Sequence, residues 1–369
     1  MARRLGLVVN PIAGMGGPIG LKGSDGWTAS DLAGLGAVAR SGGRASLAVE
    51  QLRRLGGPEV LTAAGAMGQD AVADAGLPAT VVYVPPRPAT TSEDTRRAVR
   101  TFMRAGCDII LFAGGDGTAR DVFSEVGRAA VVLGIPTGVK IHSAAFARSP
   151  ATAGDVAAAY VAGDVHGTRE AEVVDLDEEA YRRGEVSVRL FGYLRVPDRA
   201  DSLQGSKVRS TGDDEDIDGI GLSIADAMES GVCYVIGPGT TAKAALRLLG
   251  LPYALLGVDL VVDRQIVASD LSAAELLAAT AGRRTVLVVS PIGGQGYVFG
   301  RGNQQLSPEL IRRAGEGGLV IAATPRKLAS LRGRPLVVDT GDRALDRELA
   351  GYVRVVAGHH REVVYALSD

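Results

Sequence analysis

Short, continuous apolar runs alternate with segments of helical periodicity along the first 165 residues of the chain. The runs have the length of strands and cover residues 5–10, 59–63, 80–84, 108–113 and 130–135. A strand without a polar face is typical of a parallel sheet that is buried between two layers of helices. The pattern therefore predicts an α/β domain at the start of the chain.

Helices are expected between these strands. Sequence patterns typical of a helix occur near Asp31 and over residues 46–55, 69–75 and 118–128. A further helix is predicted after residue 90, because Ala98, Val99, Phe102 and Met103 share one face at helical spacing. Thr90 and Glu93 have the spacing of a capping box, which places the start of this helix.

The pattern changes after residue 165. Residues 170–175 and 185–196 alternate apolar and polar positions, which is typical of exposed antiparallel strands. Further strand-like runs follow at 233–236, 255–262, 265–268, 285–290 and 319–323, and a last strand pair is expected between 352 and 366. We therefore predict a Rossmann-like domain over residues 1–165 and a β-rich domain over 166–320. A segment over 321–369 is expected to pack back on the first domain, with the site in the cleft between the domains.

Composition narrows the classes of function. The chain has 369 residues, enough for about two domains. The net charge is −2, from 40 basic and 42 acidic residues, and aromatic residues make up 4%. Binding to nucleic acid is therefore not expected, since both a basic surface and a stacking platform are missing. No apolar run approaches the ~20 residues of a membrane span, and Cys107 and Cys233 read as free thiols. We expect a cytoplasmic protein with no membrane partner.

The strongest chemical signal is the string Gly114-Gly115-Asp116-Gly117-Thr118, between a predicted strand and a predicted helix. Glycines let backbone amides approach an anion, and the positive end of the helix dipole favours one there. A carboxylate repels phosphate, so Asp116 fits this loop if it holds Mg²⁺ or accepts a proton from an attacking hydroxyl. The combination indicates phosphoryl transfer. The alternative is a tight turn in which Asp116 only caps the helix.

Lysines and histidines add further candidates. Lys22, Lys140 and Lys243 each lie beside a glycine-rich or small-residue loop, and a compact ammonium suits a phosphate. The alternative is that these three lysines are exposed side chains that lie beside the loops by chance. His142, next to Ser143, is either a substrate contact or an ordinary packing residue. His359 and His360 are expected to be solvated loop residues, because adjacent side chains do not converge well on one metal.

The string at 114–118 resembles the ATP-NAD kinase superfamily, which also includes diacylglycerol and sphingosine kinases. Residues 10–17 are similar to the superfamily's N-terminal Asn-Pro-x-x-Gly loop, which contacts nucleotide phosphates. Residues 237–242 are similar to the Thr-Pro-Thr-Gly-Ser-Thr-Ala segment of NAD kinases, and Ser290-Pro291-Ile292 resembles the Pro-Ile of their β-rich domain. Residues 134–143 and 293–305 are most similar to the AcoX-like branch.

The resemblance implies a Mg²⁺-dependent small-molecule kinase with ATP as the phosphoryl donor. NAD is the leading acceptor, at the 2′-hydroxyl of its adenosine ribose, and a homo-oligomer is expected. Asp116 is implied as the catalytic base or the Mg²⁺ ligand. The implied phosphate-binding residues are Asn10, Gly14, Gly16, Gly114, Gly115, Gly117, Thr118 and Lys140. The implied substrate-binding residues are Ser143, Gly237, Gly239, Thr240, Thr241 and Lys243.

One departure keeps other functions open. NAD kinases carry an Asn-Glu or Asn-Asp pair on an early strand of the second domain, and the comparable residues 188–194 have no such pair. A kinase of another hydroxyl metabolite, with an AcoX-like catabolic role, is therefore a second hypothesis. A non-catalytic regulator that binds NAD or ATP is a third. A membrane-lipid kinase is disfavoured, because the chain has no polybasic amphipathic segment.

Overall fold

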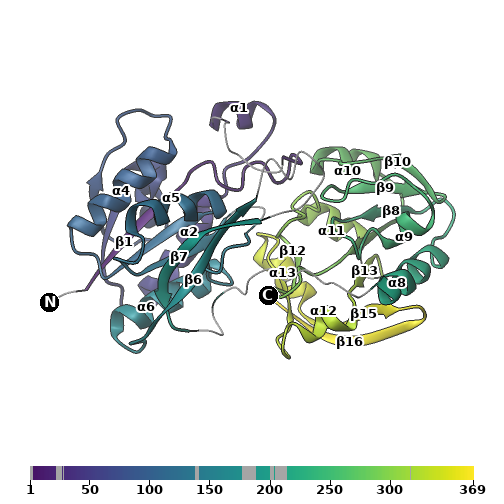
Figure 1. Ribbon diagram of the computed structural model, residues 1–369. Helices are drawn as coiled ribbons and strands as arrows, with labels where there is room; N and C mark the ends of the chain where they lie inside the picture. Colours follow the sequence, from purple (N-terminus) through teal and green to yellow (C-terminus); the bar gives the residue numbers. More distant parts are fainter. Residues whose placement is uncertain are drawn as a thin grey trace. The chain divides into compact units, whose positions relative to one another are not determined.

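The computed structural model describes residues 3–21, 27, 29–137, 141–176, 188–199, 203, 214–315 and 317–369 (Figure 1). The chain forms two compact units. Unit 1 consists of Met1–Met15 and Gly23–Ser206, and unit 2 consists of Gly16–Lys22 and Lys207–Asp369. None of the described helices combines the length and the apolar character that crossing a bilayer requires.

Among the described residues, unit 1 contains a parallel five-stranded sheet in the order β3-β2-β1-β4-β5. Its strands are β1 (Arg4–Val9), β2 (Glu59–Ala63), β3 (Ala79–Tyr83), β4 (Ile109–Gly114) and β5 (Val132–Pro136). Every residue of β4 and β5 is buried, as expected for strands that are covered on both faces. The predicted Rossmann-like domain is confirmed, and each strand lies within two residues of its predicted bounds.

Helices follow the strands of unit 1. They are α1 (Ala29–Gly34), α2 (Ser41–Arg54), α3 (Gln69–Asp74), α4 (Ser92–Arg104), α5 (Asp116–Val126) and α6 (Pro150–Ala162), with a short 3₁₀ turn, η1, at Gly65–Met67. Helix α2 packs against α6, and α4 packs against α5.

The N-terminus of α4 corrects one prediction. The capping box joins Thr91 and Asp94, one residue later than predicted, and Oδ2 of Asp94 accepts from the Thr91 amide at 2.8 Å. Glu93 instead pairs with Arg96 and Arg97 on the outer face of the helix. The buried side chains of Ala98, Val99 and Phe102 are as predicted.

A two-stranded antiparallel sheet completes unit 1. It pairs β6 (Thr168–Leu176) with β7 (Val188–Pro197), and both strands contact α5. The alternation predicted two antiparallel strands here, and the structure pairs them with each other. Residues 185–187 of the second predicted strand lie outside the described residues. This pair belongs to unit 1, which extends beyond residue 165.

In the described part of unit 2, nine strands form one sheet in the order β10-β9-β8-β11-β13-β15-β16-β14-β12. They are β8 (Cys233–Ile236), β9 (Asp259–Val262), β10 (Gln265–Ala268), β11 (Thr285–Val289), β12 (Tyr297–Phe299), β13 (Leu319–Ala322), β14 (Leu336–Val338), β15 (Gly351–Gly358) and β16 (Arg361–Ser368). This confirms the predicted β-rich second domain. Residues 321–369 contribute β14, β15 and β16 to this sheet.

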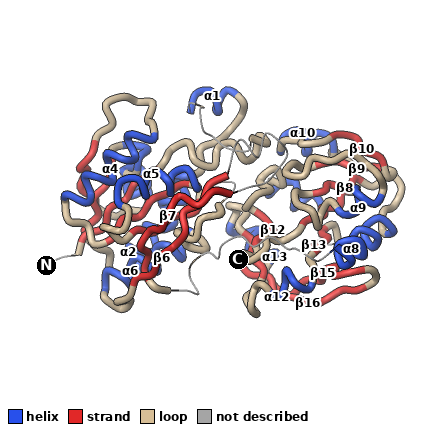
Figure 2. Tube along the Cα trace, in the orientation of Figure 1, coloured by secondary structure: helices blue, strands red, loops and turns tan. Residues whose placement is uncertain are grey.

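Helices cover the sheet of unit 2 on both faces. They are α8 (Asp214–Asp226), α9 (Ala244–Leu248), α10 (Ala273–Ala279), α11 (Pro308–Ala314), α12 (Pro325–Ala329) and α13 (Arg343–Leu349) (Figure 2). Alternate residues of the central strands enter two different hydrophobic clusters. Val235 and Leu287 lie in one, while Tyr234 and Val288 lie in the other together with residues of α8. When the side chains on both faces of a strand are buried, its sequence is continuously apolar. Such a strand can be recognised from the sequence.

Candidate functional site

The turn from β4 to α5 is the first part of the candidate site. Strand β4 ends at Gly114, Gly115 is the extended N-cap residue, and Asp116 is the first residue of α5. A Cβ atom on Gly114 would collide with the side chain of Thr118. This close approach explains the glycine, and it leaves the free amides of an 11-residue helix at the carboxyl end of a central strand. Such an arrangement favours an anion.

Asn10 joins the loop after β1 to this turn. Its Nδ2 donates to Oγ1 of Thr118 at 3.0 Å, and its Oδ1 accepts from the amide of Ile12 at 3.2 Å. Strands β1 and β4 are neighbours in the sheet, so both glycine-rich loops lie at the same edge, as their positions after strands predict. Gly14 has a φ of +80°, which glycine adopts without strain. Gly16 belongs to unit 2.

The carboxylate of Asp116 is already engaged. The side chain is 5% exposed, and Oδ2 accepts from the amide of His142 at 2.7 Å and lies 3.0 Å from its Nδ1. Oδ1 accepts from the amide of Ser143 at 2.9 Å. A carboxylate has about four acceptor positions, so roughly one remains for a further partner. Asp116 therefore anchors the chain after β5 to the glycine turn, a contact that the sequence did not predict.

The hydroxyl of Ser143, which was predicted to contact substrate, bonds to the backbone of β6. Its hydroxyl donates to the carbonyl of Val174 at 2.9 Å and accepts from the amide of the same residue at 3.1 Å. The residue is fully buried. Because both functions of the hydroxyl are used by β6, its role is to attach this chain segment to the antiparallel pair. His142 is also buried, against Asp116, and Lys22 and Lys140 lie outside the described residues.

A second glycine turn follows β8 in unit 2. Gly237 donates to the carbonyl of Val288 at 2.8 Å, and Gly239, with a φ of +103°, donates to that of Leu255 at 2.9 Å. Thr240 is exposed, whereas Thr241 is buried. Residues 240–243 form turns, and helix α9 begins at Ala244.

Lys243 corrects the prediction of a phosphate-binding lysine. Its side chain is 1% exposed, and its Nζ donates to Oδ2 of Asp259 at 2.7 Å and to the carbonyl of Ile236 at 2.8 Å. Burial lowers the pKa of Lys243 to about 8, although the neighbouring Asp259 acts in the opposite direction. This ammonium group holds α9 to β8 and β9, and it is not available to a ligand.

Lys327, on α12, is a cation beside the turn after β8 that was not among the predicted site residues. Its Nζ donates to Oγ1 of Thr241 at 3.0 Å and to Oγ of Ser290 at 2.8 Å. The half-buried side chain thus joins the turn after β8 to the Ser290-Pro291 segment after β11. These two strands are parallel neighbours, so their carboxyl ends lie side by side. The signal was present in the sequence, since Lys327 is one of the few lysines and follows the predicted strand at 319–323.

Comparison with family models matches both units. The ATP-NAD kinase N-terminal domain matches residues 5–165, and the ATP-NAD kinase C-terminal domain matches residues 229–367. The chain belongs to the ATP-NAD kinase family. The glycine turn with Asp116 lies in the N-terminal match of this family, and the cluster of Thr241, Ser290 and Lys327 lies in the C-terminal match. No curated protein and no solved structure matches the chain.

Proposed function

We propose that this chain is a Mg²⁺-dependent phosphotransferase that transfers the γ-phosphoryl group of ATP to a hydroxyl group. The leading acceptor is the 2′-hydroxyl of the adenosine ribose of NAD. The observation that carries the proposal is the glycine turn between β4 and α5, in which backbone amides and a buried carboxylate occur together in a chain of the ATP-NAD kinase family. Phosphoryl transfer depends mainly on positioning and charge stabilisation, which such a turn provides.

In this proposal the phosphates bind to backbone amides of unit 1. The amides at Gly115, Gly117 and Thr118 and the positive end of α5 supply the favourable field. Asn10 and Gly114 shape the turn, as their contacts with Thr118 require. Gly14, Gly16 and Lys140 are proposed as further phosphate contacts.

Asp116 fits Mg²⁺ in its donor chemistry, because the ion prefers hard oxygen ligands. The three donors already around its carboxylate limit this contact to the remaining position of Oδ1. We therefore assign Asp116 as a positioning residue whose carboxylate also meets the hydration shell of the ion. When bound, Mg²⁺ neutralises charge on the phosphate oxygens.

In unit 2, Lys327 is proposed as the ligand-binding cation in place of Lys243. Its ammonium group, Oγ1 of Thr241 and the backbone of Gly237 and Gly239 are proposed to contact a ribose or a phosphate, together with the exposed Thr240. An ammonium that is held by two hydroxyls is preorganised, so little side-chain freedom is lost when an anionic group binds.

Replacing Lys327 by Met tests this assignment. We expect kcat/KM to fall about 10- to 100-fold, because a charge-assisted hydrogen bond contributes about 1.5–3 kcal/mol. Steady-state kinetics with ATP and the acceptor measure the effect. Arg326→Ala removes an exposed positive charge from the same helix and serves as the matched control. Equal kinetics in the two variants would contradict a role for Lys327 in binding.

The acceptor is tested by following ATP consumption with NAD and with a panel of small hydroxyl compounds. Formation of NADP supports the leading proposal. ADP formed only with another hydroxyl compound favours the AcoX-like alternative, which the missing Asn-Glu pair in residues 188–194 motivates. Tight binding of NAD or ATP without turnover of any acceptor would favour a regulator and overturn the kinase proposal.

A further inference from the structure

Three side chains of unit 2 converge at the turn of the last hairpin. His359 and His360 form the two-residue turn between β15 and β16, and their ring centroids are 3.9 Å apart. Oδ2 of Asp226, the last residue of α8, lies 3.5 Å from Nε2 of His359. One ligand atom from each of the three lies within 4.8 Å of the others. Both histidines are exposed turn residues, as expected, but their side chains converge with Asp226, which was not expected.

The backbone explains why the two rings share one side of the turn. His360 has a φ of +50°, which costs a residue other than glycine about 1–2 kcal/mol. Successive side chains of an extended strand point in opposite directions, but this left-handed residue breaks the alternation. Strain of this kind persists where surrounding contacts determine the backbone, and it often marks a functional position.

Helix α8 supplies those surrounding contacts. Oγ of Ser223 accepts from the amide of His360 at 2.9 Å and donates to the carbonyl of Gly358 at 3.1 Å. Gly219 permits the close approach, since a Cβ atom there would lie 2.7 Å from the amide nitrogen of His359. The turn is thus fixed on the helix that also carries Asp226. The ligand atoms are brought together before anything binds.

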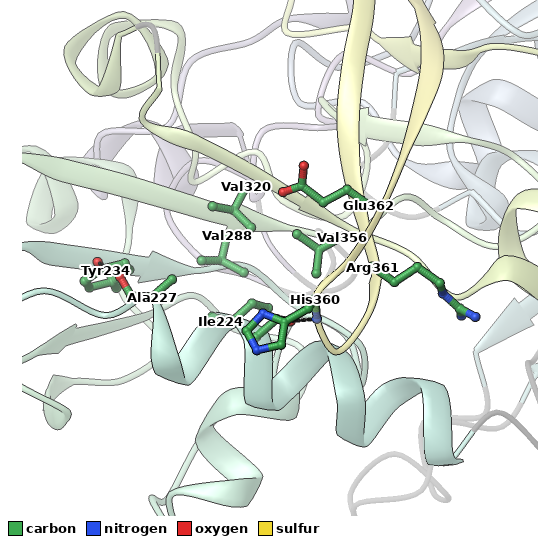
Figure 3. Close-up of a pocket in the computed structure, with 10 residues that line it drawn as sticks. Ile224, Ala227, Tyr234, Val288, Val320, Val356, His360, Arg361 and Glu362 are labelled. Atoms are coloured by element: carbon green, nitrogen blue, oxygen red, sulfur yellow. Dashed lines mark hydrogen bonds between the residues drawn. The ribbon is translucent and has the colours of Figure 1, made fainter.

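The charges near the turn favour a cation. Asp226 lies at the carboxyl end of α8, where the helix dipole is negative. The guanidinium group of Arg361 donates to Asp216 at 2.7 Å and to the carbonyl of Ala357 at 2.8 Å. Arg361 lines the same pocket as His360 (Figure 3), and its guanidinium group is engaged by these two acceptors. That pocket has a volume of about 470 Å³, and its apolar lining includes Ile224, Val288, Val320 and Val356.

We propose that Asp226, His359 and His360 bind a divalent transition-metal ion of the Zn²⁺ or Co²⁺ type. Imidazole ligands suit zinc, cobalt, nickel and copper, whereas Mg²⁺ prefers oxygen ligands and water. The ligands of this site therefore differ in type from those expected around the Mg²⁺ of the proposed phosphotransferase. Three protein ligands leave coordination positions for water or for another ligand. All three side chains are exposed, so a metal ion can reach them from solvent.

Zn²⁺ binding to the whole protein, freed of metal by a chelator that is then removed, tests the proposal. Competition with a chromophoric chelator measures the affinity, and the visible spectrum of bound Co²⁺ reports nitrogen ligation. We expect one equivalent to bind, with the affinity reduced at least about 100-fold in His359→Ala, His360→Ala and Asp226→Asn. Loss of an outer-shell partner alone typically costs 10–100-fold, and these variants lose a direct ligand.

The matched control is His166→Ala, which removes an exposed histidine of unit 1 and should bind Zn²⁺ like the unchanged protein. Circular dichroism checks that each variant is folded. Equal affinity in the unchanged protein and in the three ligand variants would overturn the proposal, and so would an unchanged protein that binds no Zn²⁺. Neither result bears on the phosphotransferase activity, because the titration contains no nucleotide and no Mg²⁺.

Discussion

Replacing Lys243 by Met should lower the free energy of unfolding by about 3–5 kcal/mol, the cost of removing one partner from a buried ion pair. Asp259 is fully buried, and its carboxylate also accepts from the amides of Ala254 at 3.0 Å and Asp270 at 3.1 Å. The substitution therefore leaves an anion in the interior of unit 2 without its cation. Urea unfolding followed by circular dichroism measures the change.

The double variant Lys243→Met with Asp259→Asn is the control. The side-chain oxygen of Asn still accepts one backbone hydrogen bond, and no charge is left unpaired, so the double variant should be more stable than Lys243→Met alone. A phosphate-binding lysine predicts the opposite pattern, with unchanged stability and a raised KM. That pattern would contradict the structural role assigned to Lys243.

The fold could be predicted because its signals are local. Strands β4 and β5 of unit 1 and strands β8 and β11 of unit 2 are buried along their whole length, so their sequences are almost entirely apolar. The glycine turn at Gly114 could be predicted for the same reason, since its cause, the side chain of Thr118, is only four residues away.

The direction of a polar side chain could not be predicted, because its partners are distant in the sequence. Lys243 turns inward because Asp259 and the carbonyl of Ile236 receive it. Asp116 turns toward His142 and Ser143, whose position depends on how β6 pairs with β7 and packs on α5. Spacing places both residues beside a glycine turn, but only the packed structure shows which groups they contact.

The packing of β6 and β7 shows the same limit. Alternation identified β6 and β7 as antiparallel strands, and such strands suggested the start of the β-rich domain. The pair instead contacts α5 and β5 of unit 1. Periodicity reveals that one face of a strand is buried, but it does not reveal which neighbour covers that face.

Replacing Asp116 by Asn should lower the turnover of ATP by about 10²-fold or more. The amide group of Asn puts an N–H donor opposite the amide of His142 or that of Ser143, where an oxygen now accepts. A buried donor without a partner costs about 1–3 kcal/mol. The variant also loses the negative charge that is proposed to face the hydration shell of Mg²⁺. Steady-state kcat at saturating ATP measures the loss of turnover. A Mg²⁺ titration of the rate measures the change in the Mg²⁺ requirement.

Ser143→Ala separates the carboxylate from the segment that it anchors. This variant removes the hydroxyl bonds to Val174 but keeps the amide that donates to Asp116, so it should lose about 1–3 kcal/mol of stability. Its kcat at a temperature where it is folded should stay within a few-fold of the unchanged protein. The Mg²⁺ concentration for half-maximal rate should rise in Asp116→Asn and not in Ser143→Ala, because only the first substitution removes a charge. Normal turnover and an unchanged Mg²⁺ requirement in folded Asp116→Asn would remove Asp116 from the proposed site.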